Sequence, residues 1–182
     1  LPHNAISQYL ESRLGNFTYY GKTFVAEEAM RLNKGNCMSL AIMTTALTRI
    51  VGLDFDYREI NSAPIFEKHN DIILSSSHVQ TFLYDPSFIE KDEVFYLSKP
   101  GIAIDYFPSS SSDAGMKLSY SSFISIYYQN IAASHLVAAE YNHAFAYAMK
   151  AYEFDPESAS TINLLALIHK RRGDIITAEK IY

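Results

Sequence analysis

The chain has 182 residues, of which 48% are hydrophobic and 19% charged, and its formal net charge is −5. This composition is typical of a globular protein and excludes a disordered chain. The negative charge, without a stripe of Lys and Arg on any predicted helix, excludes nucleic acid as an expected partner. One cysteine excludes an internal disulfide and any cysteine-based zinc site. No apolar run reaches the ~18 residues of a transmembrane segment.

The beginning of the chain predicts two helices separated by an extended segment. Apolar spacing predicts the first helix over residues 4–14. Residues 17–20 are rich in aromatic and β-branched side chains and predict an extended segment. Thr23 is placed to cap a second helix that ends near Asn33.

The third predicted helix contains the single cysteine. A turn at residues 35–36 brings Cys37 to the first turn of this helix, and Gly52 ends it as a C-terminal cap. The residues expected on its buried face are Leu40, Met43, Leu47 and Ile50. A helix N-terminus favours thiolate over thiol and offers backbone N–H groups to an oxyanion. We therefore expect a nucleophilic Cys37 with a pKa below the ~8.5 of a free thiol.

The middle of the chain predicts the first strands of a small sheet. Residues 55–60 alternate as a strand does, and the polar residues 61–71 predict a loop. A second strand begins at 72–74 and is interrupted by a turn at the serines 75–77. Residues 78–84 form a β-rich run that a histidine opens.

Further strands are predicted over residues 94–97 and 101–107, with a proline at 108 to end the last one. Residues 109–115 form a short Ser-rich stretch. We place the domain boundary in this stretch. The predicted domains are therefore 1–115 and 116–182.

Residues after Ser119 predict helices with a period of 34 residues. The matched pairs are Ala132 with Ala166, Ala144 with Ala178, and His135 with His169. The period and the small residues are typical of tetratricopeptide repeats, and an unrelated helical hairpin is the alternative. Because each repeat buries its apolar face on a neighbour, we expect these helices to pack on the first domain, to continue beyond Tyr182, or both.

A nucleophilic cysteine needs a base, and the base needs an orienting group. Of the six histidines, His3 lies in the first helix and His69 reads as a solvated residue of a charged loop. The repeat region contains His135, His143 and His169, of which His135 and His169 occupy equivalent packing positions and are expected to be structural. His78 heads an apolar strand and is the expected base; a strand-end histidine bonded to the backbone is the alternative.

Two aspartates are candidates for the orienting group. Asp85 precedes a proline and reads as a turn residue that caps its own loop. Asp105 is the single charge in an apolar run, where a carboxylate is costly unless it is paired. An imidazolium on an adjacent strand would be such a partner, so we choose Asp105.

These residues resemble the transglutaminase-like superfamily, which has the fold of papain-like cysteine proteases. The motifs that carry the resemblance are residues 35–40 (Gly-Asn-Cys-Met-Ser-Leu), 78–79 (His-Val) and 104–108 (Ile-Asp-Tyr-Phe-Pro). The order of cysteine helix, histidine strand and aspartate strand is that of the family. The resemblance implies an α+β fold, with N-terminal helices packed on a small antiparallel sheet, followed by all-α tetratricopeptide repeats.

The resemblance also implies the roles of the site residues. Cys37 would be the nucleophile, His78 the base and Asp105 its orienter. The oxyanion donor stays open between the Cys37 backbone N–H and the side chain of Tyr19. The implied reaction is acyl transfer through a thioester, either to water, as in a peptidase or amidase, or to an amine, as in cross-linking. No calcium loop is present, and we expect neither a metal nor another cofactor.

Partners and location follow from the same resemblance. We expect a protein or peptide substrate, and a protein partner for the repeats. The alternative function is a non-catalytic peptide- or protein-binding module made of the repeats and a degenerate transglutaminase-like domain. The chain opens without Met and closes inside a helical pattern, so we read it as a piece of a longer protein. Related bacterial proteins suggest the envelope or periplasm, with a lipid anchor in the full-length protein; the cytoplasm is the alternative.

Overall fold

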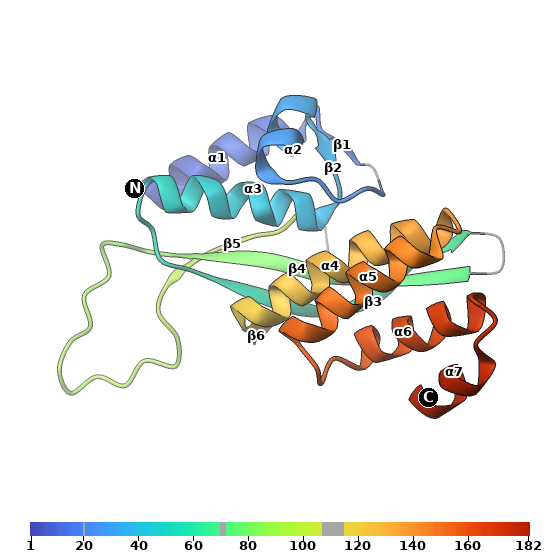
Figure 1. The fold of residues 1–182 in the computed structure, drawn as a ribbon. Helices are drawn as coiled ribbons and strands as arrows, with labels where there is room; N and C mark the ends of the chain where they lie inside the picture. Colours follow the sequence, from blue (N-terminus) through green and yellow to red (C-terminus); the bar gives the residue numbers. More distant parts are fainter. Residues whose placement is uncertain (20, 70–71, 107–114) are drawn as a thin grey trace. The chain divides into compact units, whose positions relative to one another are not determined.

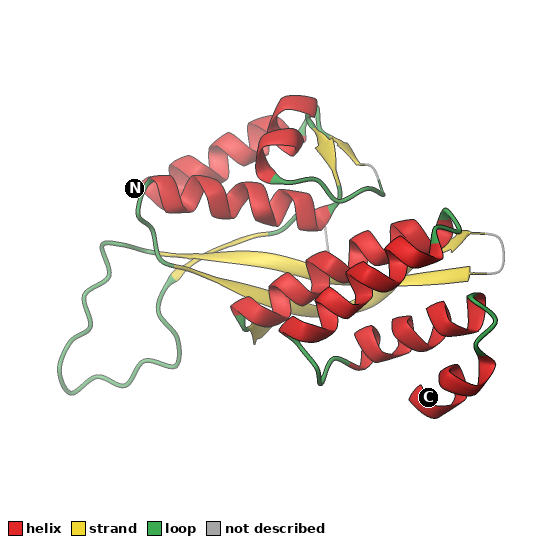
Figure 2. Cartoon of the chain, in the orientation of Figure 1, coloured by secondary structure: helices red, strands yellow, loops and turns green. Residues whose placement is uncertain are grey.

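The computed structural model describes residues 1–19, 21–69, 72–106 and 115–182, with side chains throughout except at 61–69 and 72–77. The described residues form seven helices and a four-stranded antiparallel sheet, together with a two-stranded parallel pair (Figures 1 and 2). The protein is therefore an α+β protein, as expected.

The chain divides into two compact units. The first contains Leu1–Ala63 and Ser77–Lys117, and the second contains Pro64–Ser76 and Leu118–Tyr182. The β3–β4 hairpin is thus shared between them, since its far end is grouped with the helices that follow. The sequence did not predict this grouping.

Three helices belong to the first unit: α1 (Pro2–Leu14), α2 (Ala26–Leu32) and α3 (Cys37–Ile50). Both α1 and α2 contact α3. Two short strands, β1 (Thr18–Tyr19) and β2 (Lys34–Gly35), pair in parallel beside them. Because β2 leads directly into α3, this pairing fixes the chain just before Cys37.

The sheet has the strand order β5-β4-β3-β6. Its strands are β3 (Phe55–His69), β4 (Ile72–Tyr84), β5 (Gly101–Ile104) and β6 (Met116–Leu118). In the β4–β5 ladder, Thr81 lies opposite Ile104. One residue further along this register, Asp105 is level with Gln80, two residues after His78 in β4.

Two predicted breaks in the sheet are wrong. The expected loop at 61–71 is strand as far as His69, and the expected turn at 75–77 lies inside β4. Pairing between β3 and β4 satisfies the backbone groups of these polar residues, which overrides their turn preference. His78 therefore lies within a long strand and not at its start.

Two other strand predictions need correction. Residues 94–97 form no strand, and Phe95 and Leu97 are almost fully exposed. An apolar run without a neighbouring strand gains no ladder hydrogen bonds. The last predicted strand ends at Ile104, and Asp105 follows it directly. Residues 107–114, which include most of the expected boundary stretch, lie outside the described residues.

The predicted helix ends are correct in part. Gly52 has a φ of +67° and follows α3, as a terminating glycine does. Thr23 does not cap α2, whose first residue is Ala26, because its hydroxyl accepts a hydrogen bond from Asn36 instead. Ile50 is exposed, contrary to the predicted face.

Threonines take the place of some of the expected apolar residues on the buried face of α3. Thr44, Thr45 and Thr48 are buried, and each hydroxyl donates to the carbonyl oxygen four residues earlier at 2.7–2.9 Å. A threonine can be buried in this way without an unsatisfied hydroxyl. A prediction based on apolar residues alone therefore did not include these buried threonines.

The second unit contains α4 (Tyr120–Val137), α5 (Tyr141–Phe154), α6 (Ala159–Arg171) and α7 (Ile175–Ile181). Each helix contacts the next, and α4 also contacts α6. Small residues are buried between them: Ala132, Ala144, Ala148, Ala166 and Ala178. Among the helices described in either unit, none combines the length and the hydropathy needed to traverse a lipid bilayer.

Tyr106 joins three parts of the first unit. Its ring is buried, and its hydroxyl lies 2.8 Å from the hydroxyls of Thr44 on α3 and Thr81 on β4. We expect Tyr106→Phe to lower the free energy of unfolding by about 1–3 kcal/mol, because buried hydroxyls lose a partner while the ring is retained. Urea denaturation measures this loss. Tyr9→Phe, at an exposed ring of α1, is the control and should change little; equal effects of the two variants would contradict the assigned role of Tyr106.

Candidate functional site

The turn before Cys37 depends on a glycine. Gly35 has a φ of +152°, and a Cβ at this position would lie 2.6 Å from Cβ of Ser39. Any side chain would therefore collide with the first turn of α3. This explains in physical terms why a glycine stands two residues before the cysteine.

Asn36 and Ser39 form a capping box at the start of α3. The Asn36 side chain accepts a hydrogen bond from the backbone N–H of Ser39 at 3.0 Å, and the Ser39 hydroxyl faces the backbone N–H of Asn36. The same hydroxyl accepts a hydrogen bond from the backbone N–H of Phe24 at 2.8 Å. Cys37 is therefore held as the first residue of α3.

The Cys37 thiol is partly buried, and its burial raises its pKa. Backbone N–H groups of Met38, Val79 and Cys37 itself act in the opposite direction, since hydrogen bonds to the sulfur favour the thiolate. Burial has the larger effect. The expectation of a lowered pKa is therefore wrong for the resting site, because loss of solvent outweighs the helix N-terminus.

His78 and Asp105 form a hydrogen-bonded pair. Nε2 of His78 lies 2.7 Å from Oδ1 of Asp105, and the side chains are 5% and 28% exposed. An ionised carboxylate can only accept, so Nε2 of His78 is the donor in this bond. The backbone of Val79, the residue after His78, is among the groups that lower the pKa of the Cys37 thiol.

Two tyrosines surround Asp105. The buried ring of Tyr106 fixes the position of Asp105, the residue before it, and the hydroxyl of Tyr19 donates to the backbone carbonyl of Tyr106. Burial raises the pKa of Tyr19, and so do Cys37 and Asp105 in their ionised forms. Tyr19 therefore lies among the predicted site residues, but in this structure its proton serves the Tyr106 carbonyl.

The sequence placed Asp85 and His69 outside the catalytic site, and the structure describes the side chain of Asp85 only. Asp85 accepts hydrogen bonds from the Ser87 hydroxyl at 2.6 Å and the Ser87 N–H at 2.8 Å, and these lower the pKa of its carboxyl. It is the loop-capping residue that the sequence predicted. The side chain of His69 lies outside those described.

Sequence reasoning missed two contributors to the site. The backbone of Val79 favours the Cys37 thiolate, but the position of a backbone group cannot be read from a sequence. Tyr106 does leave one, since a tyrosine in an apolar run after an aspartate needs a buried partner for its hydroxyl. That signal could have identified the support behind Asp105.

Comparison of the chain with protein-family models, with curated proteins and with solved structures finds no match. The resemblance of the motifs therefore remains an expectation, and a functional assignment has to depend on the geometry of the residues themselves.

The raised pKa of Cys37 predicts the pH dependence of its alkylation. A smaller fraction of the thiol is ionised at neutral pH, so the rate of reaction with iodoacetamide should rise with a midpoint above the ~8.5 of a free thiol. Intact-mass spectrometry over a pH series measures this rate. The same chain in concentrated urea should return to the ordinary midpoint, and a folded midpoint below that value would contradict the prediction.

Substitution of Gly35 should disturb the site directly. We expect Gly35→Ala to cost about 1–3 kcal/mol of stability, because it forces strain at a positive φ beside Ser39. Gly15→Ala is a matched control, since a Cβ there meets nothing closer than 4.0 Å. Thermal unfolding of both variants is the measurement, and equal midpoints would refute the steric role of Gly35.

Proposed function

We propose that the chain catalyses acyl transfer or amide hydrolysis through Cys37, His78 and Asp105, on a protein or peptide substrate. One observation carries the proposal: His78 and Asp105 are bonded at 2.7 Å, and the backbone of Val79, the residue after His78, favours the Cys37 thiolate. Nucleophile, base and orienting group are the three parts that thioester chemistry requires.

The reaction starts from a neutral thiol. As the sulfur attacks the carbonyl carbon of an amide, Nδ1 of His78 takes the thiol proton and the carbonyl oxygen becomes an oxyanion. The oxyanion collapses, the C–N bond breaks, and His78 gives the proton to the leaving amine. The acyl group is then bound to Cys37 as a thioester.

The second half of the reaction releases the acyl group. Water or a second amine attacks the thioester while His78 accepts its proton, and the Cys37 thiol is re-formed by return of that proton. Asp105 bonds to Nε2 throughout, which orients the ring and stabilises the imidazolium in each half-reaction.

Stabilisation of the oxyanion is assigned to N–H groups at the start of α3, with Cys37 N–H as the first candidate. Tyr19 is the second candidate. Its hydroxyl would have to leave the carbonyl of Tyr106 to serve an oxyanion. Only the Tyr19 candidate can be tested by substitution, because its hydroxyl can be removed whereas the backbone N–H of Cys37 cannot.

We further propose the family architecture that the motifs resemble, a transglutaminase-like domain followed by tetratricopeptide repeats. The 34-residue period and the buried alanines of α4–α7 support repeats. Their role would be to bind a protein partner or the substrate. A location in the bacterial envelope belongs to the same proposal.

A non-catalytic binding module is the second candidate, and one observation favours it. Burial raises the pKa of Cys37, as expected for a thiol that serves only to pack. Reactivity that depends on His78 separates the two candidates, since a packing thiol needs no base.

Replacement of His78 tests the base. We expect His78→Ala to slow alkylation of Cys37 at neutral pH by about 10²-fold, the lower limit for general base catalysis. The control is His69→Ala, at a histidine that the sequence predicts to be solvated. An unchanged rate in His78→Ala would remove the catalytic proposal and favour the binding module.

Asp105→Asn tests the orienting group against a matched aspartate. Turnover can be followed as release of ammonia or incorporation of a fluorescent primary amine into casein, with new peptide ends as the readout for hydrolysis. Asp105→Asn should lower turnover by about 10²-fold or more, because an amide no longer stabilises the imidazolium. Asp85→Asn should retain it. Loss of turnover in both variants would indicate a folding effect and not a triad.

A further inference from the structure

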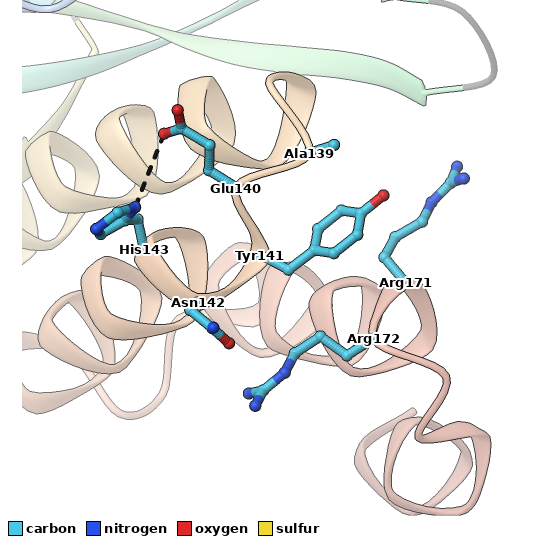
Figure 3. A pocket seen from close by; sticks show the side chains of 7 residues that line it. All are labelled: Ala139, Glu140, Tyr141, Asn142, His143, Arg171 and Arg172. Carbon is cyan, nitrogen blue, oxygen red and sulfur yellow. Dashed lines mark ion pairs between the residues drawn. The ribbon is translucent and has the colours of Figure 1, made fainter.

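The first helical hairpin of the second unit brings three metal-binding side chains together. Donor atoms of His135, Glu140 and His143 all lie within 4.8 Å of one another. Nδ1 of His135 is 2.5 Å from Oε2 of Glu140, and Nδ1 of His143 is 3.8 Å from the same oxygen. Figure 3 shows Glu140 and His143 facing each other at the rim of a hollow.

The backbone fixes the spacing of these residues. His135 lies in the last turn of α4 and Glu140 is the N-cap of α5. The Glu140 N–H donates to the His135 carbonyl at 2.9 Å, and Ala139 between them has a φ of +57°. The His135 ring also stacks on Tyr147, with centroids 5.2 Å apart. Two of the three side chains are thus positioned before any ligand binds.

We propose that His135, Glu140 and His143 bind a divalent transition-metal ion of the zinc type. Zinc bonds to imidazole nitrogen and carboxylate oxygen are about 2.0–2.2 Å long, which places two donors of a tetrahedral site about 3.3 Å apart. The observed separations of 2.5 and 3.8 Å bracket that value. Two imidazoles select zinc-like ions over calcium and magnesium, which prefer oxygen ligands.

Rotation of exposed side chains is enough to close the site. The side chains of His135, Glu140 and His143 are 30%, 51% and 71% exposed. His143 has its ring 5.3 Å from that of His135 but is otherwise largely in solvent, so its side chain can turn without disturbing the helix core. Three protein ligands leave a fourth position for water or another ligand.

The second hairpin provides an internal comparison. His169 and Asp174 stand 34 residues after His135 and Glu140, with donor atoms 3.2 Å apart. Their turn has the same hydrogen bond, from the 174 N–H to the 169 carbonyl at 3.0 Å. The position equivalent to His143 is Thr177. The histidine–acid pair is therefore common to both turns, and only the first turn has a third possible ligand, His143.

Two arginines near the proposed site oppose the binding of a cation. Arg171 and Arg172 line the same hollow of about 620 Å³ as Glu140 and His143 (Figure 3). Their charges oppose a cation, so the binding energy has to come from the three ligands together. Removal of one of the three ligands should consequently lower the affinity for the metal ion strongly.

The test uses the full 182-residue chain without an affinity tag and with Cys37→Ser, because Cys37, His78 and Asp105 are also possible zinc ligands. Calorimetric titration with ZnCl₂ should give one site per chain. His143→Ala and Glu140→Gln should each weaken zinc binding by at least about tenfold. Loss of a residue that only supports a zinc ligand already costs about 10–100-fold in affinity, so loss of a ligand should cost no less. Co²⁺ absorption should report tetrahedral coordination in the parent and lose it in His143→Ala.

His169→Ala is the matched control, because it removes the histidine of the two-ligand turn and should leave the affinity unchanged. Circular dichroism checks that each variant is folded. Absence of binding by the parent up to about 1 mM zinc would overturn the proposal. So would an affinity that His143→Ala leaves unchanged, or one that His169→Ala lowers equally.

Discussion

The hydroxyl of Tyr106 is the contact on which the first unit depends. It joins a helix, a strand and the segment after β5, because Thr44, Thr81 and Tyr106 belong to three different elements. A buried hydroxyl must be satisfied, so this contact has only one good arrangement. Asp105 is the neighbour of Tyr106 and is thereby held against His78. The position of a candidate catalytic carboxylate is thus set by a hydrogen bond that takes no part in the chemistry.

The candidate site combines two opposing electrostatic requirements. Removal of water strengthens hydrogen bonds to the sulfur, but it also disfavours the thiolate. In this chain burial has the larger effect on Cys37. In the proposed reaction, a base that accepts the proton during attack would resolve the conflict, since the charge on sulfur would never have to be stable by itself. The bond from His78 to Asp105 suits that role.

Local features of the structure could be predicted from the sequence. The start of α3 follows from a glycine that must lack a side chain and an asparagine–serine cap, and the loop at Asp85 follows from its own side chain. Each of these depends on residues fewer than five positions apart. The helices of the second unit were predictable for a related reason, because their apolar and small residues recur at a fixed period.

Features that depend on distant residues could not be predicted. The polar residues 61–69 become strand because a partner strand pairs with them, and Thr23 serves the Cys37 turn because Asn36 reaches it. The pKa of Cys37 was predicted in the wrong direction for the same reason. A helix N-terminus is visible in a sequence, whereas the amount of protein that covers a thiol is a property of the folded chain.

The protonated resting state of Cys37 has a consequence for its chemical durability. Peroxides attack the thiolate, and a cysteine sulfenic acid is rescued most readily when a second thiol captures it as a disulfide. This chain contains no second cysteine. A thiol that stays protonated is therefore slow to oxidise, and burial that lowers its reactivity also lengthens the time for which the sulfur stays reduced.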